Sequence, residues 1–329
     1  MTVLVTGGAG YIGSHTVRAL REVGRDVVVL DSLELGRAEA VLGAPLVKGD
    51  IHDASVVQQV CRDHDVTAIV HFAAYKSVGE SMQSPGKYWH NNVAGTAALV
   101  EAAMGVGVTD VVFSSSCSVY GTPTHVPVSE SAPIAAESVY ADSKVMVERI
   151  LQWYGVTSGL RSVSLRYFNA AGASRDAVIG EDWTFSINLI PLVMKAVLGA
   201  GRPVQVYGQD YPTPDGTCVR DYIHVEDLSD AHVRALDLLA DGLPDDQTSV
   251  AINLGTGIGS SVLEVINATA AVAGRDVPHE IVGRRAGDPV ATYADPTYAE
   301  ATLGWRAKQG LPEIVESAFR WHSKSTDGG

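Results

Sequence analysis

The stretch Val3-Leu-Val-Thr-Gly7-Gly8-Ala-Gly10-Tyr-Ile-Gly13 sets the fold prediction for this chain. It has the pattern of an apolar strand, a glycine turn and the start of a helix, in that order. Glycines permit the tight turn, the close approach of backbone to a pyrophosphate, and close packing of helix on strand. The helix would point its free amides and the positive end of its dipole at the phosphates. The stretch therefore predicts a dinucleotide site contacted by Gly7, Gly10, Tyr11, Ile12 and Gly13.

Apolar strands and helical patterns alternate through the first half of the chain. Helical spacing of apolar residues runs over 88–105 and over 143–154. Continuous apolar strands joined by helices indicate a parallel sheet covered on both faces, and the crossover rule gives a doubly wound (Rossmann) α/β fold. The predicted strands are 3–6, 27–30, 46–49, 67–72, 111–114 and 162–167.

The regular alternation of strand and helix patterns ends after Asn169, where loops become longer and richer in Gly, Pro and charged residues. We expect a smaller α/β lobe here that binds a substrate. The larger, cofactor-binding domain should comprise 1–168 and about 219–247. The smaller lobe should comprise about 169–218 and 248–329.

Composition excludes several classes of protein. The formal net charge of −14 would repel phosphate backbones, so nucleic acid is not an expected partner. Cys61, Cys117 and Cys218 are far apart and form no Cys-x-x-Cys pair, which argues against a disulfide framework and against a zinc or other metal site. No signal peptide and no membrane-spanning apolar run is visible, so a reduced cytoplasmic compartment is expected.

Asp31 strengthens the prediction of a cofactor site and indicates which cofactor it is. It follows the strand 27–30, where a carboxylate can bind both hydroxyls of an adenosine ribose. Such a carboxylate would repel a 2′-phosphate, so NAD is favoured over NADP; the alternative is that Asp31 only caps a turn. Further contacts are expected where later strands end at the same edge of the sheet. These are Asp50 and Ile51, and Phe72, Ala73 and Ala74.

Tyr140-Ala-Asp-Ser-Lys144 places a phenol and an ammonium one helical turn apart. Lys144 and a positive nicotinamide ring would both lower the pKa of Tyr140, which could then accept the proton of a substrate hydroxyl. Ser116, after a predicted strand, could hydrogen-bond the substrate oxygen and relay its proton. The alternative is a surface tyrosine beside a solvated lysine.

At this point the chain resembles a known family. Besides the glycine loop, Asp31, Ser116 and the Tyr-x-x-x-Lys motif, it contains Lys76-Ser-Val-Gly-Glu80, Asn91-Asn92, Ser114-Ser-Ser-Cys-Ser-Val-Tyr-Gly121, Leu165-Arg-Tyr-Phe-Asn169 and Val219-Arg-Asp-Tyr-Ile-His-Val225. Together these strings are similar to the UDP-glucose (UDP-galactose) 4-epimerase family of the extended short-chain dehydrogenase/reductase superfamily, over nearly the whole chain.

The resemblance implies a reversible inversion at sugar C4 of UDP-glucose and UDP-galactose, through a transient 4-keto sugar and with tightly bound, recycled NAD. It also implies a homodimer formed through the helices 88–105 and 143–154. The further NAD contacts that it implies are Ser32, Lys76, Asn91, Ser114, Tyr140, Lys144, Tyr167 and Phe168.

The substrate contacts are implied in the same way. Arg220 and Arg285 would clamp the diphosphate, Asp288 would bind the uridine ribose and Tyr207 would stack on uracil. The alternatives are a surface pair of Arg220 with Asp221 and a solvated turn at Arg285. The remaining implied substrate contacts are Lys76, Ser116, Tyr140, Asn169, Asn188, Leu189, Gln205 and Thr292.

Related enzymes supply the competing predictions. Nucleotide-sugar 4,6-dehydratases carry an Asp-Glu pair just after the catalytic hydroxyl residue, and UDP-glucuronate decarboxylases carry a Glu there. This chain has Cys117 and Ser118 instead, which favours epimerisation without elimination. A 4-epimerase of UDP-glucuronate or of a UDP-pentose, and an NAD-sensing regulatory protein on the same fold, remain as alternatives. Family members that also accept N-acetyl sugars carry a small residue where others carry Tyr, so Thr292 predicts use of UDP-GlcNAc and UDP-GalNAc.

Overall fold

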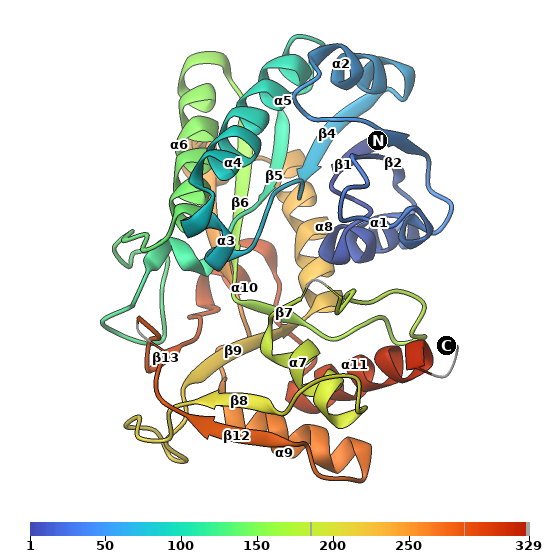
Figure 1. The fold of residues 1–329 in the computed structure, drawn as a ribbon. Helices are drawn as coiled ribbons and strands as arrows, with labels where there is room; N and C mark the ends of the chain where they lie inside the picture. Colours follow the sequence, from blue (N-terminus) through green and yellow to red (C-terminus); the bar gives the residue numbers. More distant parts are fainter. Residues whose placement is uncertain (185, 286, 327–329) are drawn as a thin grey trace.

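The glycine turn joins the first strand and the first helix of a parallel sheet, as expected. The computed structural model describes residues 1–184, 186–285 and 287–326, and in these the chain forms a larger upper lobe and a smaller lower one (Figure 1). The sheet of the larger lobe has seven strands in the order β10-β6-β5-β4-β1-β2-β3, and every pair is parallel. The strand order reverses between β1 and β4, which makes this the switch point of a doubly wound fold. Its strands are β1 (Thr2–Thr6), β2 (Asp26–Asp31), β3 (Leu46–Lys48), β4 (Val66–His71), β5 (Asp110–Ser114), β6 (Arg161–Tyr167) and β10 (Ser249–Leu254).

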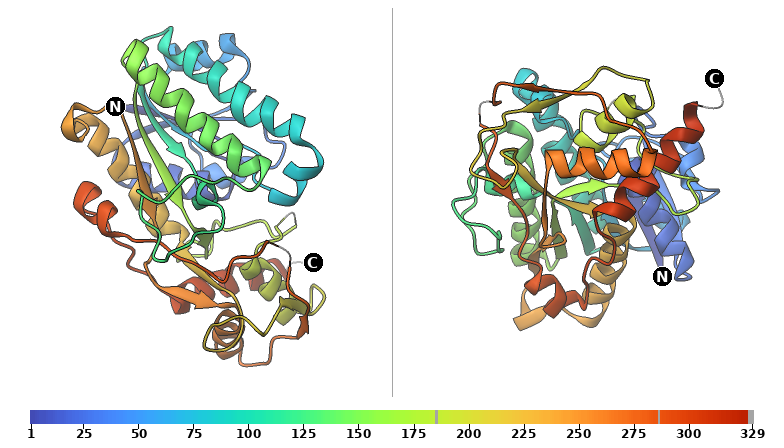
Figure 2. Two further views of the ribbon diagram at one scale, coloured as in Figure 1. Left: turned by 90° about the vertical axis from the view of Figure 1, so that its left-hand side faces the viewer. Right: turned by 90° about the horizontal axis from the view of Figure 1, so that it is seen from below.

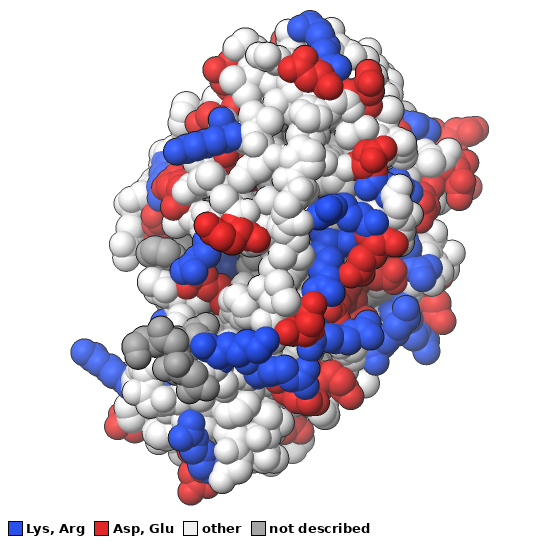
Figure 3. Space-filling view, turned by 90° about the vertical axis from the view of Figure 1, so that its right-hand side faces the viewer, with Lys and Arg blue, Asp and Glu red and all other residues white. Residues whose placement is uncertain are grey.

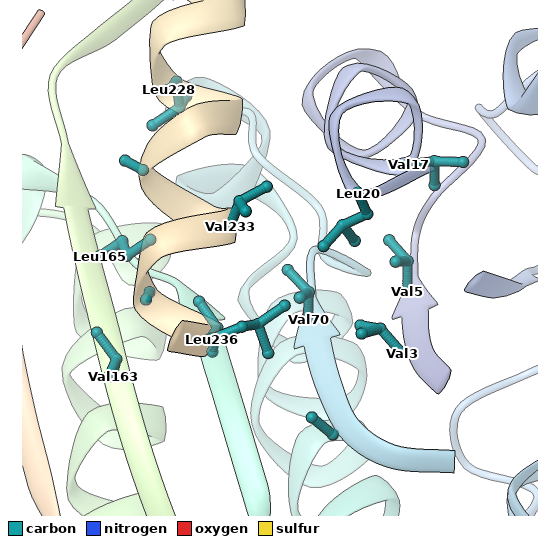
Figure 4. Packing of buried hydrophobic residues seen from close by; sticks show 14 of the residues in the cluster. Val3, Val5, Val17, Leu20, Val70, Val163, Leu165, Leu228, Val233 and Leu236 are labelled. Atoms are coloured by element: carbon teal, nitrogen blue, oxygen red, sulfur yellow. The ribbon is translucent and has the colours of Figure 1, made fainter. Parts of the chain in front are cut away.

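Two layers of helices cover the faces of this sheet (Figure 2). On one face the side chains of β1, β4 and β6 pack against Val17 and Leu20 of one helix and against Leu228, Val233 and Leu236 of another (Figure 4). These helices are α1 (Tyr11–Glu22) and α8 (Val225–Asp241), joined by α10 (Thr297–Leu303). The opposite face is covered by α2 (Ala54–Asp63), α5 (Gly95–Met104) and α6 (Val139–Ser158). Because both faces are buried, β1, β2, β4 and β5 are apolar through their centres.

The smaller lobe has its own hydrophobic core. Strand β9 (Val219–His224) is its centre and pairs with β7, β11 and β13, while β8 pairs with β12. Three helices, α7, α9 and α11, pack together on these strands. The elements are β7 (Asn169–Ala171), α7 (Leu189–Val197), β8 (Val204–Tyr207), β11 (Gly259–Ser261), α9 (Val262–Ala273), β12 (His279–Val282), β13 (Ala291–Thr292) and α11 (Leu311–Thr326).

The predicted Rossmann sheet is confirmed, and its six predicted strands agree with the structure to within one residue at each end. The division at 248 differs from the structure, because β10 adds to the sheet of the larger lobe by pairing with β6 along its whole length. The helix predicted over 88–105 is interrupted. It consists of α4 (Pro85–Tyr88), a π-helical segment (Trp89–Ala94) and α5, preceded by α3 (Val78–Gln83).

Ion pairs join the two lobes across their junction. Arg18 of α1 binds Asp176 at 2.9 Å, and Arg37 binds Asp182 at 2.5 Å. Figure 3 shows basic and acidic side chains interspersed over the middle of the face it draws. No helix in the described ranges is long and apolar enough to cross a membrane.

Candidate active site

The glycine turn leaves the start of α1 free to bind an anion. Gly7 has a φ of +70°, and a Cβ on Gly13 would lie 2.3 Å from the Gly7 carbonyl oxygen. A side chain at either position is therefore excluded by strain or by collision. Gly10 caps α1 without a side-chain hydrogen bond, so no side chain covers the first amides of the helix. This end of the helix fits the pyrophosphate of a dinucleotide.

Asp31 is held in place at the end of β2. One carboxylate oxygen accepts from the Ala9 amide at 3.0 Å and the other accepts from the Leu33 amide at 2.9 Å. The side chain is buried, yet it lines the groove that starts at the glycine turn. Each carboxylate oxygen has a further lone pair, so both oxygens remain able to accept a ribose hydroxyl. Asp31 thus orders the turn, as the turn-cap alternative requires, and its carboxylate remains available for the predicted ribose contact.

A groove of about 310 Å³ runs from the glycine turn to Tyr140 and Lys144. Every predicted NAD contact lines it except Phe168, which is packed with Val119 and Val128 in a separate hydrophobic cluster. The predicted residues along the groove are Gly7, Gly10, Tyr11, Ile12, Gly13, Asp31, Ser32, Asp50, Ile51, Phe72, Ala73, Ala74, Lys76, Asn91, Ser114, Tyr140, Lys144 and Tyr167.

Part of the groove wall was not predicted from the sequence. Glu181, Asp182 and Ser186 reach it from the loop that follows β7. Glu181 is buried and binds Lys76, whose Nζ lies 3.1 Å from Oε1. The loop carries no motif, and only the folded chain brings it against Lys76, some 105 residues earlier.

Tyr140 and Lys144 lie on one face of α6, at the end of the groove. Ser138 caps this helix through the Ala141 amide, and the Tyr140 amide donates to Ser81 Oγ at 3.1 Å. Lys144 Nζ donates to the Ser114 carbonyl at 2.7 Å and lies 5.8 Å from the centre of the Tyr140 ring. The first two turns of α6 are thus pinned to the carboxyl end of β5.

Burial determines the protonation of both groups. Loss of solvation raises the pKa of Tyr140 well above its usual value, Tyr167 raises it further, and a hydrogen bond with Ser116 opposes the shift. Burial lowers the pKa of Lys144 to about 7, opposed by the negative charge of Glu148. The expected lowering of the Tyr140 pKa is not found in the chain alone, because desolvation raises it.

The π-helical segment explains how Asn91 and Asn92 both contribute to the site. Asn91 faces the groove, whereas Asn92 is buried and bonds both backbone groups of Tyr75. The Asn92 amide also donates to Ser143 Oγ of α6 at 3.3 Å. An interrupted helix of this kind is frequent at functional sites, and here it ties α6 to the loop after β4.

The residues expected to bind the diphosphate and the uridine form one cluster in the smaller lobe. Arg220 binds Asp288 at 2.5 Å, and the Arg285 guanidinium stacks over the ring of Tyr207, 4.2 Å from its centre. Tyr207 also donates to Gln205 at 2.8 Å. The suggested pair of Arg220 with Asp221 does not form. Asp221 is buried and accepts hydrogen bonds from Thr256, Gly257 and Ala294 instead.

The other predicted substrate residues lie on neighbouring elements. Asn169 of β7 is exposed and donates to the Asp221 carbonyl, and Thr292 of β13 lies opposite Arg220 in the sheet. Thr292 is buried, and its hydroxyl has no hydrogen-bond partner. Asn188 is the exposed cap of α7, which begins at Leu189, and makes no side-chain capping bond.

Comparison with known proteins decides the family. Residues 3–255 match the NAD dependent epimerase/dehydratase family. The chain belongs to this family. A dinucleotide groove that ends at a Tyr-Lys pair is consistent with membership.

Members of this family are similar to the chain over its full length. The UDP-glucose 4-epimerase of Lacticaseibacillus casei is 44% identical, with 100% of this chain and 98% of that protein covered. A UDP-glucose-4-epimerase structure from Stenotrophomonas maltophila, with bound NAD and formylated UDP-arabinopyranose, has a TM-score of 0.96 at 42% identity and full coverage of both chains. The UDP-Glc/GlcNAc 4-epimerase structure from Campylobacter jejuni has a TM-score of 0.86 at 37% identity, covering 98% of this chain and 99% of that one.

Proposed function

We propose that this chain interconverts UDP-glucose and UDP-galactose by inverting sugar C4, with an NAD that stays bound. The observation that carries the proposal is the groove itself, which runs from the glycine turn and Asp31 to Tyr140 and Lys144. The full-length similarity to UDP-glucose 4-epimerases supports the choice of substrate.

Bound NAD supplies a positively charged group that accepts a hydride from sugar C4 and returns it, so the net redox change is zero. Tyr140 takes the proton of the C4 hydroxyl as the 4-keto sugar forms, and gives it back when the sugar is reduced on its other face. Ser116 hydrogen-bonds the Tyr140 phenol, which supports a role in which both hydroxyls contact the C4 oxygen of the sugar. Burial keeps Tyr140 protonated in the chain alone, so a cation in the groove is needed before the phenol can act as a base.

The residues beside Ser116 favour epimerisation over elimination. Elimination of water needs an added acid and base, whereas this position holds Cys117 and Ser118. Burial raises the pKa of the Cys117 thiol to about 12, so it stays protonated at neutral pH. Ser118 is occupied in a hydrogen bond to Ser116 Oγ at 2.9 Å.

The decisive experiment incubates the purified protein with UDP-galactose and no added NAD, and measures UDP-glucose. Turnover is expected; a requirement for stoichiometric NAD would indicate a dehydrogenase instead. Tyr140→Phe should keep its NAD and lose about 100-fold or more of kcat, since general acid–base catalysis is typically worth that much. Full activity of this variant would remove Tyr140 from the mechanism.

A UDP-pentose is the second candidate substrate, because a similar structure binds a formylated UDP-arabinopyranose. The same assay with UDP-arabinopyranose and UDP-xylose separates the two. A kcat/KM above that for UDP-galactose would make the pentose the preferred substrate.

Thr292 supports a wider specificity that includes UDP-GlcNAc and UDP-GalNAc. Its buried hydroxyl lacks a partner, and a 2-acetamido group is able to supply one. Thr292→Tyr should lower kcat/KM for UDP-GlcNAc by about 10-fold or more, with little change for UDP-glucose, since overpacking costs about 1–3 kcal/mol. Equal use of UDP-GlcNAc by both proteins would contradict this prediction.

We further propose that the protein is a homodimer in the cytoplasm. Apolar side chains stand exposed along one face of α6, as Met146, Trp153 and Val156 do at 40%, 67% and 68% exposure. Exposed apolar side chains gathered on one helix face are typical of an interaction surface. The three cysteines are free, which accords with a reducing compartment.

A further inference from the structure

A buried ion pair lies directly behind the catalytic groups. Arg166 of β6 binds Glu148 of α6 in a fork, with Nε at 2.9 Å from Oε1 and Nη2 at 2.5 Å from Oε2. Glu148 stands one helical turn after Lys144 on the same face of α6. Lys144 lines the groove, whereas Glu148 and Arg166 border a separate cavity. The Arg166 and Glu148 side chains are only 9% and 13% exposed. Such a pair is costly to desolvate, and it is weak support for stability alone.

The pair holds the segment that carries Ser114 and Ser116. Ser115, between them, is fully buried and donates to Glu148 Oε1 at 2.5 Å. Its neighbour Ser114 provides the carbonyl that accepts from Lys144. One carboxylate therefore fixes the strand end from which both of these serines project.

The Arg166 guanidinium extends the contact toward the smaller lobe. Its Nη1 donates to Tyr120 Oη at 2.9 Å, and Tyr120 donates to Asn253 at 2.7 Å. Asn253 in turn donates to the Val128 carbonyl at 2.9 Å. Val128 pairs with Tyr293, the residue after Thr292, through a backbone bond of 2.8 Å. Hydrogen bonds thus run from behind Lys144 to the segment beside the expected sugar site.

We propose that Glu148, fixed by Arg166, is a positioning residue: it anchors the Ser114–Ser116 segment and maintains the ammonium of Lys144. The inference rests on the proposed roles of Tyr140, Lys144 and Ser116. Around Lys144, Glu148 is the acidic group that favours its charged form. Tyr140 on the same helix and His71 on β4 are neutral, since burial raises the pKa of the phenol and lowers that of His71 to about 3.

The test is Glu148→Gln, which keeps the shape of the side chain and removes its charge. A cavity of about 270 Å³ borders both Glu148 and Arg166, so water is able to solvate the arginine that is left. We expect kcat to fall about 10-fold, as for other small displacements of catalytic groups. With the carboxylate gone, Lys144 loses its proton more easily, so the alkaline limb of the kcat profile should move down by about one pH unit.

The matched control is Asp110→Asn. Asp110 and Arg161 form an equivalent fork, at 2.8 and 2.7 Å, at the opposite ends of β5 and β6. This variant should lose stability but keep both kcat and the pH profile. A Glu148→Gln profile that matches the control would overturn the proposal. If Tyr140→Phe remains fully active, it is the proposed site that fails instead.

Ser115→Ala tests the anchoring role separately and leaves the ion pair intact. Its kcat should fall while the alkaline limb stays in place, because the charge near Lys144 is unchanged. Wild-type kcat in this variant would overturn the anchoring role of Glu148. For both variants, a single-turnover experiment measures how fast the sugar reduces the bound NAD. The absorbance of NADH monitors this chemical step, and product release does not contribute to it.

Discussion

At the scale of single residues, burial shifts both members of the catalytic pair toward their neutral forms. It raises the pKa of Tyr140 and lowers that of Lys144 to about 7, so each shift favours the neutral form. A phenolate–ammonium pair is therefore not supplied by the chain alone. The sequence indicated the spacing of the two side chains but not their desolvation, which depends on how deeply α6 packs against β5. Because the neutral phenol is preferred, Tyr140 can act as a base only when a cation occupies the groove.

Lys144→Met should stabilise the NAD-free protein, and more at pH 6 than at pH 9. Unfolded lysine titrates near ~10.4 and folded Lys144 near about 7, so between these values the unfolded chain holds a proton that the folded chain lacks. Stability of the wild type then rises with pH across this window, and the cost of the buried ammonium is full below it. The gain from the substitution should be about 2–3 kcal/mol larger at pH 6.

Denaturant unfolding at the two pH values measures this difference. Lys48→Met is the control, because Lys48 is exposed and its substitution should have the same effect at both values. A gain for Lys144→Met that does not change with pH would show that the ammonium is not the source of the cost.

At the scale of elements, sequence patterns predicted what is local. The strand, turn and helix at Gly7 to Gly13 follow from neighbouring residues, and the prediction that they bind a dinucleotide rests on the same residues. The break at 89–94 did not, because the apolar spacing continues through it while Asn92 turns inward to bond Tyr75. Strand β10 was assigned to the wrong lobe for a related reason. Its partner β6 lies 87 residues earlier, and nothing in the sequence of β10 indicates that it pairs with β6.

Gly13→Ala tests the close packing of the turn on α1. The added Cβ would lie 2.3 Å from the Gly7 carbonyl oxygen, so the turn must shift away from the first amides of the helix. We expect the NAD that copurifies with the protein to fall about 10-fold, and stability to fall by about 1–3 kcal/mol. Gly86→Ala in α4 is the control, since a Cβ there meets no atom within 4 Å. Equal NAD content in the two variants would show that the turn tolerates the collision.

At the scale of the whole molecule, the site is completed by contacts between the lobes. Glu181 and Asp182 of one lobe bind Lys76 and Arg37 of the other, across the groove that holds the expected cofactor contacts. Sequence reasoning located each motif within one lobe and missed these residues, because their positions are fixed by tertiary packing alone. The smaller lobe thus both carries the residues expected to bind the diphosphate and the uridine and forms a wall of the NAD groove.

We predict that the proposed homodimer forms through the exposed face of α6. Met146, Arg149, Trp153 and Val156 follow one another at intervals of three and four, so they share one face of the helix, which lies beside α5 on the outside of the larger lobe (Figure 1). Trp153→Glu should give a monomer at concentrations where the wild type is a dimer, because a charge would have to be buried in the interface. Ile258→Glu is the control: Ile258 is 73% exposed in the smaller lobe, and its substitution should leave the dimer intact. Light scattering after gel filtration measures both masses, and equal masses for the two variants would place the interface elsewhere. If instead the Trp153 variant is monomeric and still converts UDP-galactose, each groove is complete within one chain.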